Sequence, residues 1–345
     1  MEGSTLLAAR RPRVLAALSL ALLVAPAIVV ASPVFAHSRV LADSASCADA
    51  VTSVPTGPAT VSAARSAFGK VLVIGSGDYT GCSLYLLTSD QLHAMTGQPF
   101  ACSDGANAIG LACDTVLWPA LLTQGAPIAG PGVNPTLLGT VTRTDLPGLP
   151  SVKQVTYAGY PLYRFFLDEE VGETDGADLF DPVTSPTGTW YLVNSRGRPA
   201  PGRAHIELET APVDGTASEA TVLSVSMDHG FVLLPDGRFP VYTLSTDGRG
   251  GRDKGACGGL CAALYWPPVL TSGRPVAGPG VDQNALGTSV RPDGTHQVTY
   301  HGRPLYLFEN DAYIPTLPYN GGAASINGAG LSTPWGVFNT IPALP

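Results

Sequence analysis

The chain has 345 residues and a net charge of −8, with 13% charged residues, 40 glycines and 31 prolines. So many turn-forming residues exclude a helical bundle and favour short strands joined by tight turns. An acidic chain without a cluster of Lys and Arg lacks the basic surface that nucleic-acid binding requires, so no nucleic acid is expected as a partner.

Residues 1–36 have the pattern of a secretory signal peptide. Three arginines precede an apolar run over residues 14–30, and Val34-Phe35-Ala36 supplies a cleavage pattern that ends in a small residue. Removal after Ala36 leaves no stable membrane span and places the protein at the cell surface or in the medium. The alternative is an uncleaved signal anchor, because the apolar run is just long enough to cross a bilayer.

The next segments in chain order are short. Residues 37–69 are rich in Ala, Ser, Thr and Pro and are interpreted as a leader. Two windows, Ala59–Phe68 and Gln91–Met95, have apolar residues at helical spacing and predict short helices. Apolar runs at 71–74 and 231–234 are bounded by turn residues and predict strands.

A long segment of the chain occurs twice. Residues 118–143 and 266–291 agree at 15 of 26 positions without a gap, and 154–168 agree with 297–311 at 10 of 15. A tryptophan, Trp190 or Trp335, stands near the end of each copy. Self-similarity of this kind indicates a tandem duplication. The predicted boundaries are given by position: repeat unit 1 over 70–197, a linker over 198–220 and repeat unit 2 over 221–345.

Each unit reads as a small all-β domain. Gln154–Tyr157, the turn Ala158-Gly159 and the run Tyr160–Leu167 have the form of a hairpin, with β-branched and aromatic residues in both arms. The fold class predicted is therefore all-β: two tandem small β domains, sandwich- or barrel-like and rich in hairpins, after the signal peptide.

Each unit also carries the pattern Tyr-x-apolar-x-x-Asp twice. It begins at Tyr85, Tyr163, Tyr242 and Tyr306 and ends at an aspartate. We expect these aspartates to cap turns at the strand ends and the aromatic residues to lie in the core. The alternative is a glycan- or polymer-binding face lined by Tyr163 and Tyr306.

These patterns resemble a bacterial family of secreted and lipoprotein repeats that has no known function and is named for the motif Tyr-x-(Phe/Trp/Tyr)-x-x-Asp. The resemblance covers both units and implies export without implying a reaction. This chain lacks the lipobox of many relatives, so membrane anchoring is not carried over. The residues that carry the resemblance are Tyr163, Phe165, Asp168, Trp118, Tyr306, Phe308, Asp311 and Trp266.

The six cysteines are even in number and follow the proposed cleavage site, which favours disulfides in an oxidising compartment. Cys257 and Cys261 stand three residues apart before Trp266, whereas the corresponding pair, Cys102 and Cys113, has a spacer of ten. A cross-link tolerates that difference better than a redox dithiol does. The remaining pair would be Cys47 with Cys82. The alternative is an extracytoplasmic redox or copper-type site at Cys257 and Cys261.

One acidic run, residues 168–181, is the candidate for a hard metal ion. Carboxylates at this density are ligands for Ca²⁺, and the weak candidates are Asp168, Glu173, Asp175 and Asp178. The spacing of a calcium-binding loop is not met and the second copy has one carboxylate there, so a solvated acidic loop is favoured over a metal site.

The sequence predicts neither a catalytic constellation nor a cofactor. We therefore expect a non-catalytic binding or cell-envelope interaction module, with a cell-surface or extracellular ligand. The alternative function is the redox or metal-binding role of Cys257 and Cys261.

Overall fold

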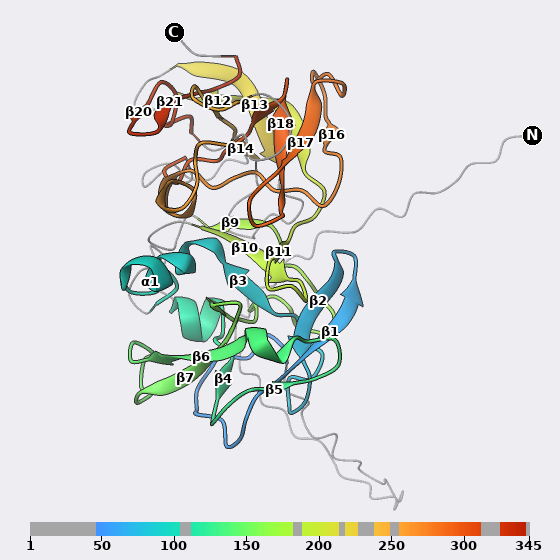
Figure 1. Cartoon of the computed structure of the whole chain (residues 1–345), viewed down its shortest axis with the longest axis vertical. Coiled ribbons are helices and arrows are strands. Elements are labelled where there is room, and N and C mark those ends of the chain that lie inside the picture. Colours follow the sequence, from blue (N-terminus) through green and yellow to red (C-terminus); the bar gives the residue numbers. More distant parts are fainter. Residues whose placement is uncertain are drawn as a thin grey trace, which may run out of the picture. The chain divides into compact units, whose positions relative to one another are not determined.

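The computed structural model describes residues 46–103, 112–181, 188–213, 218–226, 238–248, 255–311 and 325–342. Ser44–Pro345 form one compact unit. The predicted signal peptide and the apolar run 231–234 lie outside the described residues. The described chain consists mostly of short strands in six small sheets, which confirms the all-β class, and none of these sheets closes on itself (Figure 1).

The first repeat of the structure runs from β1 to β11. Its first sheet has β1 (Thr60–Ser66) between β2 (Gly69–Ile74) and β5 (Ile128–Ala129). The second sheet contains β3 (Tyr85–Leu87), β9 (Leu179–Asp181), β10 (Gly188–Val193) and β11 (Pro199–Ala200). The third contains β4 (Leu122–Thr123), β6 (Leu138–Arg143), β7 (Val152–Tyr157) and β8 (Tyr160–Pro161).

The second repeat runs from β12 to β21. Its first sheet has the order β14 (Arg238–Pro240), β13 (Glu219–Ser226), β12 (His205–Pro212) and β16 (Val276–Ala277). A second sheet has β15 (Thr243–Leu244), β21 (Gly336–Asn339) and β20 (Ser332–Thr333). The third has β17 (Leu286–Val290), β18 (His296–Tyr300) and β19 (Arg303–Pro304).

The two repeats share their strand pairing. Each repeat contains a long hairpin, β1–β2 or β12–β13. A two-residue strand pairs in parallel with the first arm of each hairpin: β5 with β1, and β16 with β12. In each, a five-residue π-helix precedes the tryptophan: η2 (Cys113–Leu117) before Trp118, and η4 (Cys261–Tyr265) before Trp266. The similarity that is visible in sequence from Trp118 onward therefore extends upstream to β1 and β12.

Two sequence expectations at the start of the repeats differ from the structure. Ala59–Phe68 was expected to be helical but contains strand β1, which pairs with β2 from Val61 to Ser66. The expected linker 198–220 contains β12 and the first residues of β13. These two strands pair along eight residues each. Cross-strand pairing determines the secondary structure of both segments, because local sequence pattern is a weak preference that tertiary contacts override.

Other local expectations agree with the structure. The helix expected at Gln91–Met95 is α1 (Gln91–Thr96), which ends at Gly97 in the left-handed conformation, with φ 71°. The expected hairpin turn joins β7 to β8. Ala158 and Gly159 both have positive φ, 51° and 89°, as a tight turn of this twist requires.

The buried apolar side chains of the described residues form clusters, two built mainly from each repeat, and Leu270 and Phe180 each belong to a cluster of the other repeat. The core of the first repeat that matters for the site holds Tyr85, Trp118, Tyr163, Phe165 and Trp190. Its counterpart holds Tyr242, Trp266, Tyr306, Phe308 and Phe338. Within the described part of the chain, no helix has both the length and the apolar character to span a membrane.

Candidate ligand-binding site

The four motif tyrosines lie side by side in pairs at the centre of the repeats. Tyr85 and Tyr163 exchange two backbone hydrogen bonds, with N–O distances of 2.9 and 3.1 Å, and Tyr242 and Tyr306 exchange two of 2.9 Å. All four side chains are fully buried. Each pair brings together the two copies of the motif that one repeat contains.

The side chains of the first pair are crossed. The hydroxyl of Tyr85 donates to Asp168 at 2.6 Å, and the hydroxyl of Tyr163 donates to Asp90 at 2.7 Å. Each tyrosine therefore bonds the aspartate of the other motif, not that of its own. In the second repeat the same crossing brings Tyr242 against Asp311 and Tyr306 against Asp247.

The second oxygen of each motif aspartate accepts a hydrogen bond from the backbone of a following loop. In the first repeat Asp90 accepts from the Ala101 N–H at 2.9 Å and Asp168 from the Asp175 N–H at 2.8 Å. In the second, Asp247 accepts from Ala256 at 2.5 Å and Asp311 from Asn327 at 2.8 Å. These carboxylates hold loop backbone 7 to 16 residues further along the chain, whereas the expectation was a cap on the turn at their own strand end.

Burial sets the charge state of the crossed pairs. It raises the pKa of Asp168 to about 7 and that of Asp90 to about 6, against the opposing effect of the tyrosine hydroxyls and backbone N–H groups. Burial likewise raises the pKa of Tyr85 and Tyr163 well above 10, so both remain neutral donors.

Stacked aromatic rings complete each core. Trp118 lies on Trp190 with ring centroids 3.7 Å apart, and Trp266 lies on Phe338 at 3.6 Å. Trp190 faces Leu87 across β10 and β3, and Phe338 faces Leu244 across β21 and β15. Phe338 is therefore the structural counterpart of Trp190, and Trp335, the tryptophan near the end of the second copy, is not.

The remaining motif residues are structural as well. Phe165 and Phe308 lie 4.3 Å, centroid to centroid, from Trp118 and Trp266. The alternative of a glycan-binding face on Tyr163 and Tyr306 is wrong, because an aromatic platform needs exposed rings and both are 0% exposed.

The six cysteines lie in the three pairs that were expected. The pairs at disulfide distance are Cys47–Cys82, Cys102–Cys113 and Cys257–Cys261. Cys257 and Cys261 are 1% and 0% exposed. Because a reactive dithiol needs access to its partner, this burial favours a structural bond over exchange.

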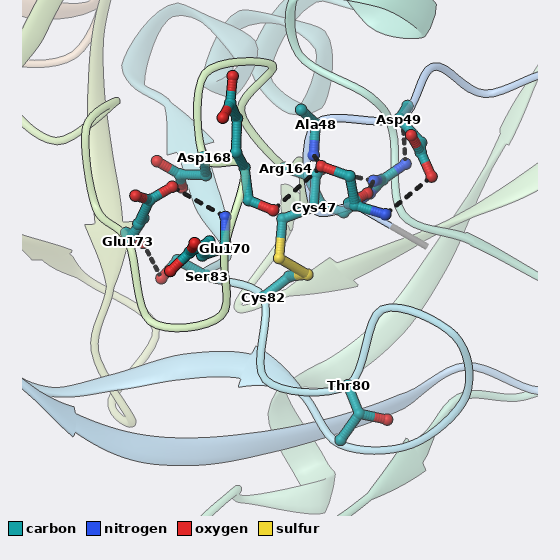
Figure 2. The surroundings of a disulfide bond; sticks show 12 residues. Cys47, Ala48, Asp49, Thr80, Cys82, Ser83, Arg164, Asp168, Glu170 and Glu173 are labelled. Carbon is teal, nitrogen blue, oxygen red and sulfur yellow. Dashed lines mark hydrogen bonds between the residues drawn. A yellow bond between two sulfur atoms is a disulfide. The ribbon is translucent and has the colours of Figure 1, made fainter. Parts of the chain in front are cut away.

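The Cys47–Cys82 bond holds the N-terminal segment of the described chain against the first repeat (Figure 2). Beside it, the buried guanidinium of Arg164 donates to the backbone carbonyls of Cys47 at 2.6 Å and Asp49 at 2.7 Å. It also lies 3.9 Å from the centroid of the Tyr79 ring. In the second repeat, Leu307 takes the place of Arg164 in the aligned sequence.

Three carboxylates of the acidic run are hydrogen-bonded within the protein. Asp168 is bonded to Tyr85, the Glu173 carboxylate accepts from the Glu170 N–H at 2.9 Å, and Asp178 accepts from the Gly202 N–H at 2.7 Å. Across the described residues, no group of three or more His, Cys, Asp or Glu side chains has the arrangement of a metal site.

A buried arginine that the sequence analysis did not single out lies next to the crossed pair of the first repeat. Arg143, at the end of β6, is 1% exposed and every side of its guanidinium is occupied. Its partners are Gln154 Oε1 at 2.6 Å, Asp114 at 2.6 Å, Asp145 at 2.7 Å, the Cys102 carbonyl at 2.9 Å and the Phe100 ring at 4.7 Å.

Arg291 is the counterpart of Arg143 in the second repeat. It closes the aligned segment 266–291 as Arg143 closes 118–143, which is the sequence signal that could have identified both. It keeps the bond to the equivalent glutamine, Gln297, at 2.7 Å. Within the described residues, this is the one hydrogen bond of its side chain.

A cavity of about 330 Å³ adjoins Arg291. Most of its wall comes from the second repeat, and residues near α1 and β8 of the first repeat complete it. Polar groups of Ser289, Thr295 and Gln297 line it together with the apolar side chains of Pro268 and Leu270. The wall is therefore mixed, and Arg291 and Asp293 add one charge of each sign to it.

Comparison with known proteins gives one family. A family model described as a secreted repeat of unknown function matches residues 287–315. No curated protein and no solved structure matches the chain.

The matched segment includes part of the cavity wall. It begins in β17 and contains Arg291, Gln297 and the second motif of the second repeat, from Tyr306 to Asp311. The family description agrees with export and names no reaction.

Proposed function

We propose that the protein is an exported, non-catalytic binding module of the cell envelope, in which both repeats are copies of the secreted repeat. The observation that carries the proposal is the cavity beside Arg291, whose volume of about 330 Å³ is in the range of small-molecule sites. Its ligand is a cell-surface or extracellular molecule, or a group on such a polymer.

The shared architecture supports the assignment of both repeats to one family. The matched segment covers only the second repeat. The first repeat has the same parallel strand beside its hairpin and the same backbone exchange between motif tyrosines. These features depend on tertiary pairing and are hard to reproduce without common ancestry.

The state of the motif carboxylates supports a non-catalytic role. A general acid or base must reach a proton on a bound substrate. Asp90, Asp168, Asp247 and Asp311 are at most 7% exposed, and each is engaged with loop backbone. The raised pKa values of Asp90, Asp168 and Asp247 follow from burial inside the fold, which does not require a substrate.

A sedimentation assay tests the proposal. The secreted protein is incubated with purified bacterial cell-wall material, and both the bound protein and the soluble fragments released are measured. We expect saturable co-sedimentation without release of fragments. Time-dependent release would make the protein an enzyme, and the lack of saturable binding to wall, polysaccharide or membrane fractions would contradict an envelope module.

A matched pair of variants connects binding to the cavity. Gly258 lines the cavity, and a Cβ atom added at Gly258 or at Gly273 meets no atom within 4 Å. Gly258→Trp places an indole at the cavity and should reduce co-sedimentation, whereas Gly273→Trp should leave it unchanged. Equal binding by the two variants would remove the cavity from the proposal.

The redox or copper role of Cys257 and Cys261 is the second candidate, and one observation favours it: Cys257 borders the cavity. Intact mass of the secreted protein after alkylation, with and without prior reduction and added copper, separates the two proposals. A binding module has no free thiol before reduction and retains no copper. A labelled thiol or a bound copper ion would favour the redox or metal role.

A further inference from the structure

The cavity beside Arg291 in the second repeat has a counterpart position in the first repeat, beside Arg143, where side chains of the first repeat lie against the guanidinium. Around Arg143 stand the Phe100 ring, the Cys102 carbonyl and the Asp114 carboxylate. Asp114 is the second residue of π-helix η2, and Ala262 is the second residue of η4. The loop N–H that Asp90 binds belongs to Ala101, and the one that Asp247 binds belongs to Ala256.

This register makes Gly255, Cys257 and Ala262 the counterparts of Phe100, Cys102 and Asp114. All three line the cavity, together with Arg291. The ring and the carboxylate that cover the guanidinium in the first repeat are thus replaced by a glycine and an alanine. Both replacements therefore lie in the wall of the cavity, next to Arg291.

We propose that the cavity binds a carboxylate group through Arg291, in the position that the Asp114 carboxylate occupies on Arg143. The first repeat shows the interaction within the same chain, since Arg143 Nη2 bonds Asp114 at 2.6 Å. Asp114 takes one Nη2 donor of Arg143, whereas Asp145 takes both Nε and Nη2. Asp293 is the aligned counterpart of Asp145, so the carboxylate that the second repeat lacks is the one of Asp114. A charge-assisted hydrogen bond from a guanidinium to a ligand carboxylate would replace it. The proposal rests on the binding function above and names the ligand class of that cavity.

The charges around Arg291 favour a singly charged ligand over a phosphate. Asp293 lines the cavity, with one oxygen bonded to the N–H and hydroxyl of Thr295 at 2.8 and 2.6 Å. Asp247 lies behind the site, against Tyr306, and interacts with the charge of Arg291. Two acidic groups beside one cation repel a dianion more strongly than a monoanion.

The experiment is a calorimetric and NMR titration of the full secreted chain. The probes are N-acetylalanine, its neutral primary amide and inorganic phosphate, at constant ionic strength. We expect N-acetylalanine to bind one site and to shift an arginine side-chain N–H signal. The amide and phosphate should bind at least about tenfold more weakly, the loss expected when a charge-assisted pair is removed.

Two variants locate the effect. Arg291→Gln removes the cation and should weaken carboxylate binding at least about tenfold. Ala262→Asp installs the carboxylate that the first repeat carries at this position. It should block the probe while leaving the melting temperature equal or higher, so a loss of binding cannot be assigned to unfolding. Binding that persists in either variant overturns the proposal.

The outcomes for the function and for the ligand class are separable. Saturable binding to cell-wall material without any binding of N-acetylalanine refutes the carboxylate site and leaves the envelope module standing. Equal affinity for the acid and its amide, or preference for phosphate, also refutes it. Binding of the acid without binding to any envelope fraction refutes the envelope module and leaves the carboxylate site standing.

Discussion

At the scale of single residues, the two motifs of a repeat are held together by reciprocal tyrosine–aspartate hydrogen bonds. We call the pair Tyr85–Asp168 and Tyr163–Asp90 the crossed clasp. Tyr85 and Asp168 stand 83 positions apart in sequence, and Asp90 and Tyr163 stand 73 apart. Each hydroxyl satisfies a buried carboxylate that also holds a loop. The tyrosines therefore contribute both apolar area and the neutralising donor for a group that is costly to bury alone.

Removal of one hydroxyl should destabilise the fold. Tyr85→Phe keeps the ring and leaves an Asp168 oxygen without its donor, so we expect the free energy of unfolding to fall by about 1–3 kcal/mol. Denaturant unfolding measures the change. Tyr300→Phe, at a partly exposed residue in β18, is the matched control and should change stability by less than about 0.5 kcal/mol. Equal effects would contradict the clasp.

The sequence alone predicts the motif residues but not their partners. The spacing Tyr-x-x-x-x-Asp suggests a self-contained motif, and only the backbone pairing of Tyr85 with Tyr163 reveals the exchange between motifs. Arg143 and Arg291 are missed for a different reason. An arginine at a strand end is usually solvated, and burial of this one depends on Asp114 and Gln154, which come from other elements.

At the scale of elements, pairing across strands outweighs local pattern. Ala59–Phe68 has a helical spacing of apolar residues, yet Val61 and its neighbours pair with β2 on one side and β5 on the other. The hairpin β7–β8 was predictable because its turn chemistry is local. Strands β1 and β12 were not, although their partners β2 and β13 follow directly in the chain, because the helical apolar spacing of 59–68 and the turn-rich composition of 198–220 masked them.

The disulfides should differ in the stability that they provide. Cys47–Cys82 closes a loop with a sequence separation of 35, and Cys257–Cys261 one with a separation of 4. Loop-closure entropy predicts losses of about 4 and about 2 kcal/mol when both cysteines of a pair are replaced by serine. Thermal unfolding of the two double variants measures this order, and the reverse order would refute it.

A further element-scale prediction concerns the N-terminal segment. Arg164→Met keeps the length of the side chain and removes the donors to the carbonyls of Cys47 and Asp49. Hydrogen exchange of amides near residues 48–51 should accelerate, while exchange in β7 and β10 stays unchanged. Leu307→Met, at the aligned position of the second repeat, is the control. Unchanged exchange in Arg164→Met would show that the disulfide alone holds the segment.

At the scale of the whole molecule, stability should depend on pH. The pKa values of Asp90, Asp168 and Glu309 are raised to about 6, 7 and 7, chiefly by burial. Between about pH 4 and pH 7 the folded state therefore binds more protons than the unfolded state, and the free energy of unfolding falls as pH rises.

Calorimetry across this range tests the prediction. The melting temperature should be higher at pH 5 than at pH 8, and the difference should shrink in Asp168→Asn, which keeps an oxygen for the Tyr85 hydroxyl and cannot ionise. A melting temperature that is flat or rises toward pH 8 in the parent protein would contradict the raised pKa values.

The crossed clasp also constrains how the chain reaches its folded state. No segment shorter than 85–168 contains both partners of the Tyr85–Asp168 bond, and the corresponding span in the second repeat is 242–311. Contacts so distant in sequence slow folding, because the intervening chain must be ordered before they form. A repeat cut between its motifs cannot close its core. A folded unit must therefore contain at least residues 85–168 of the first repeat or 242–311 of the second.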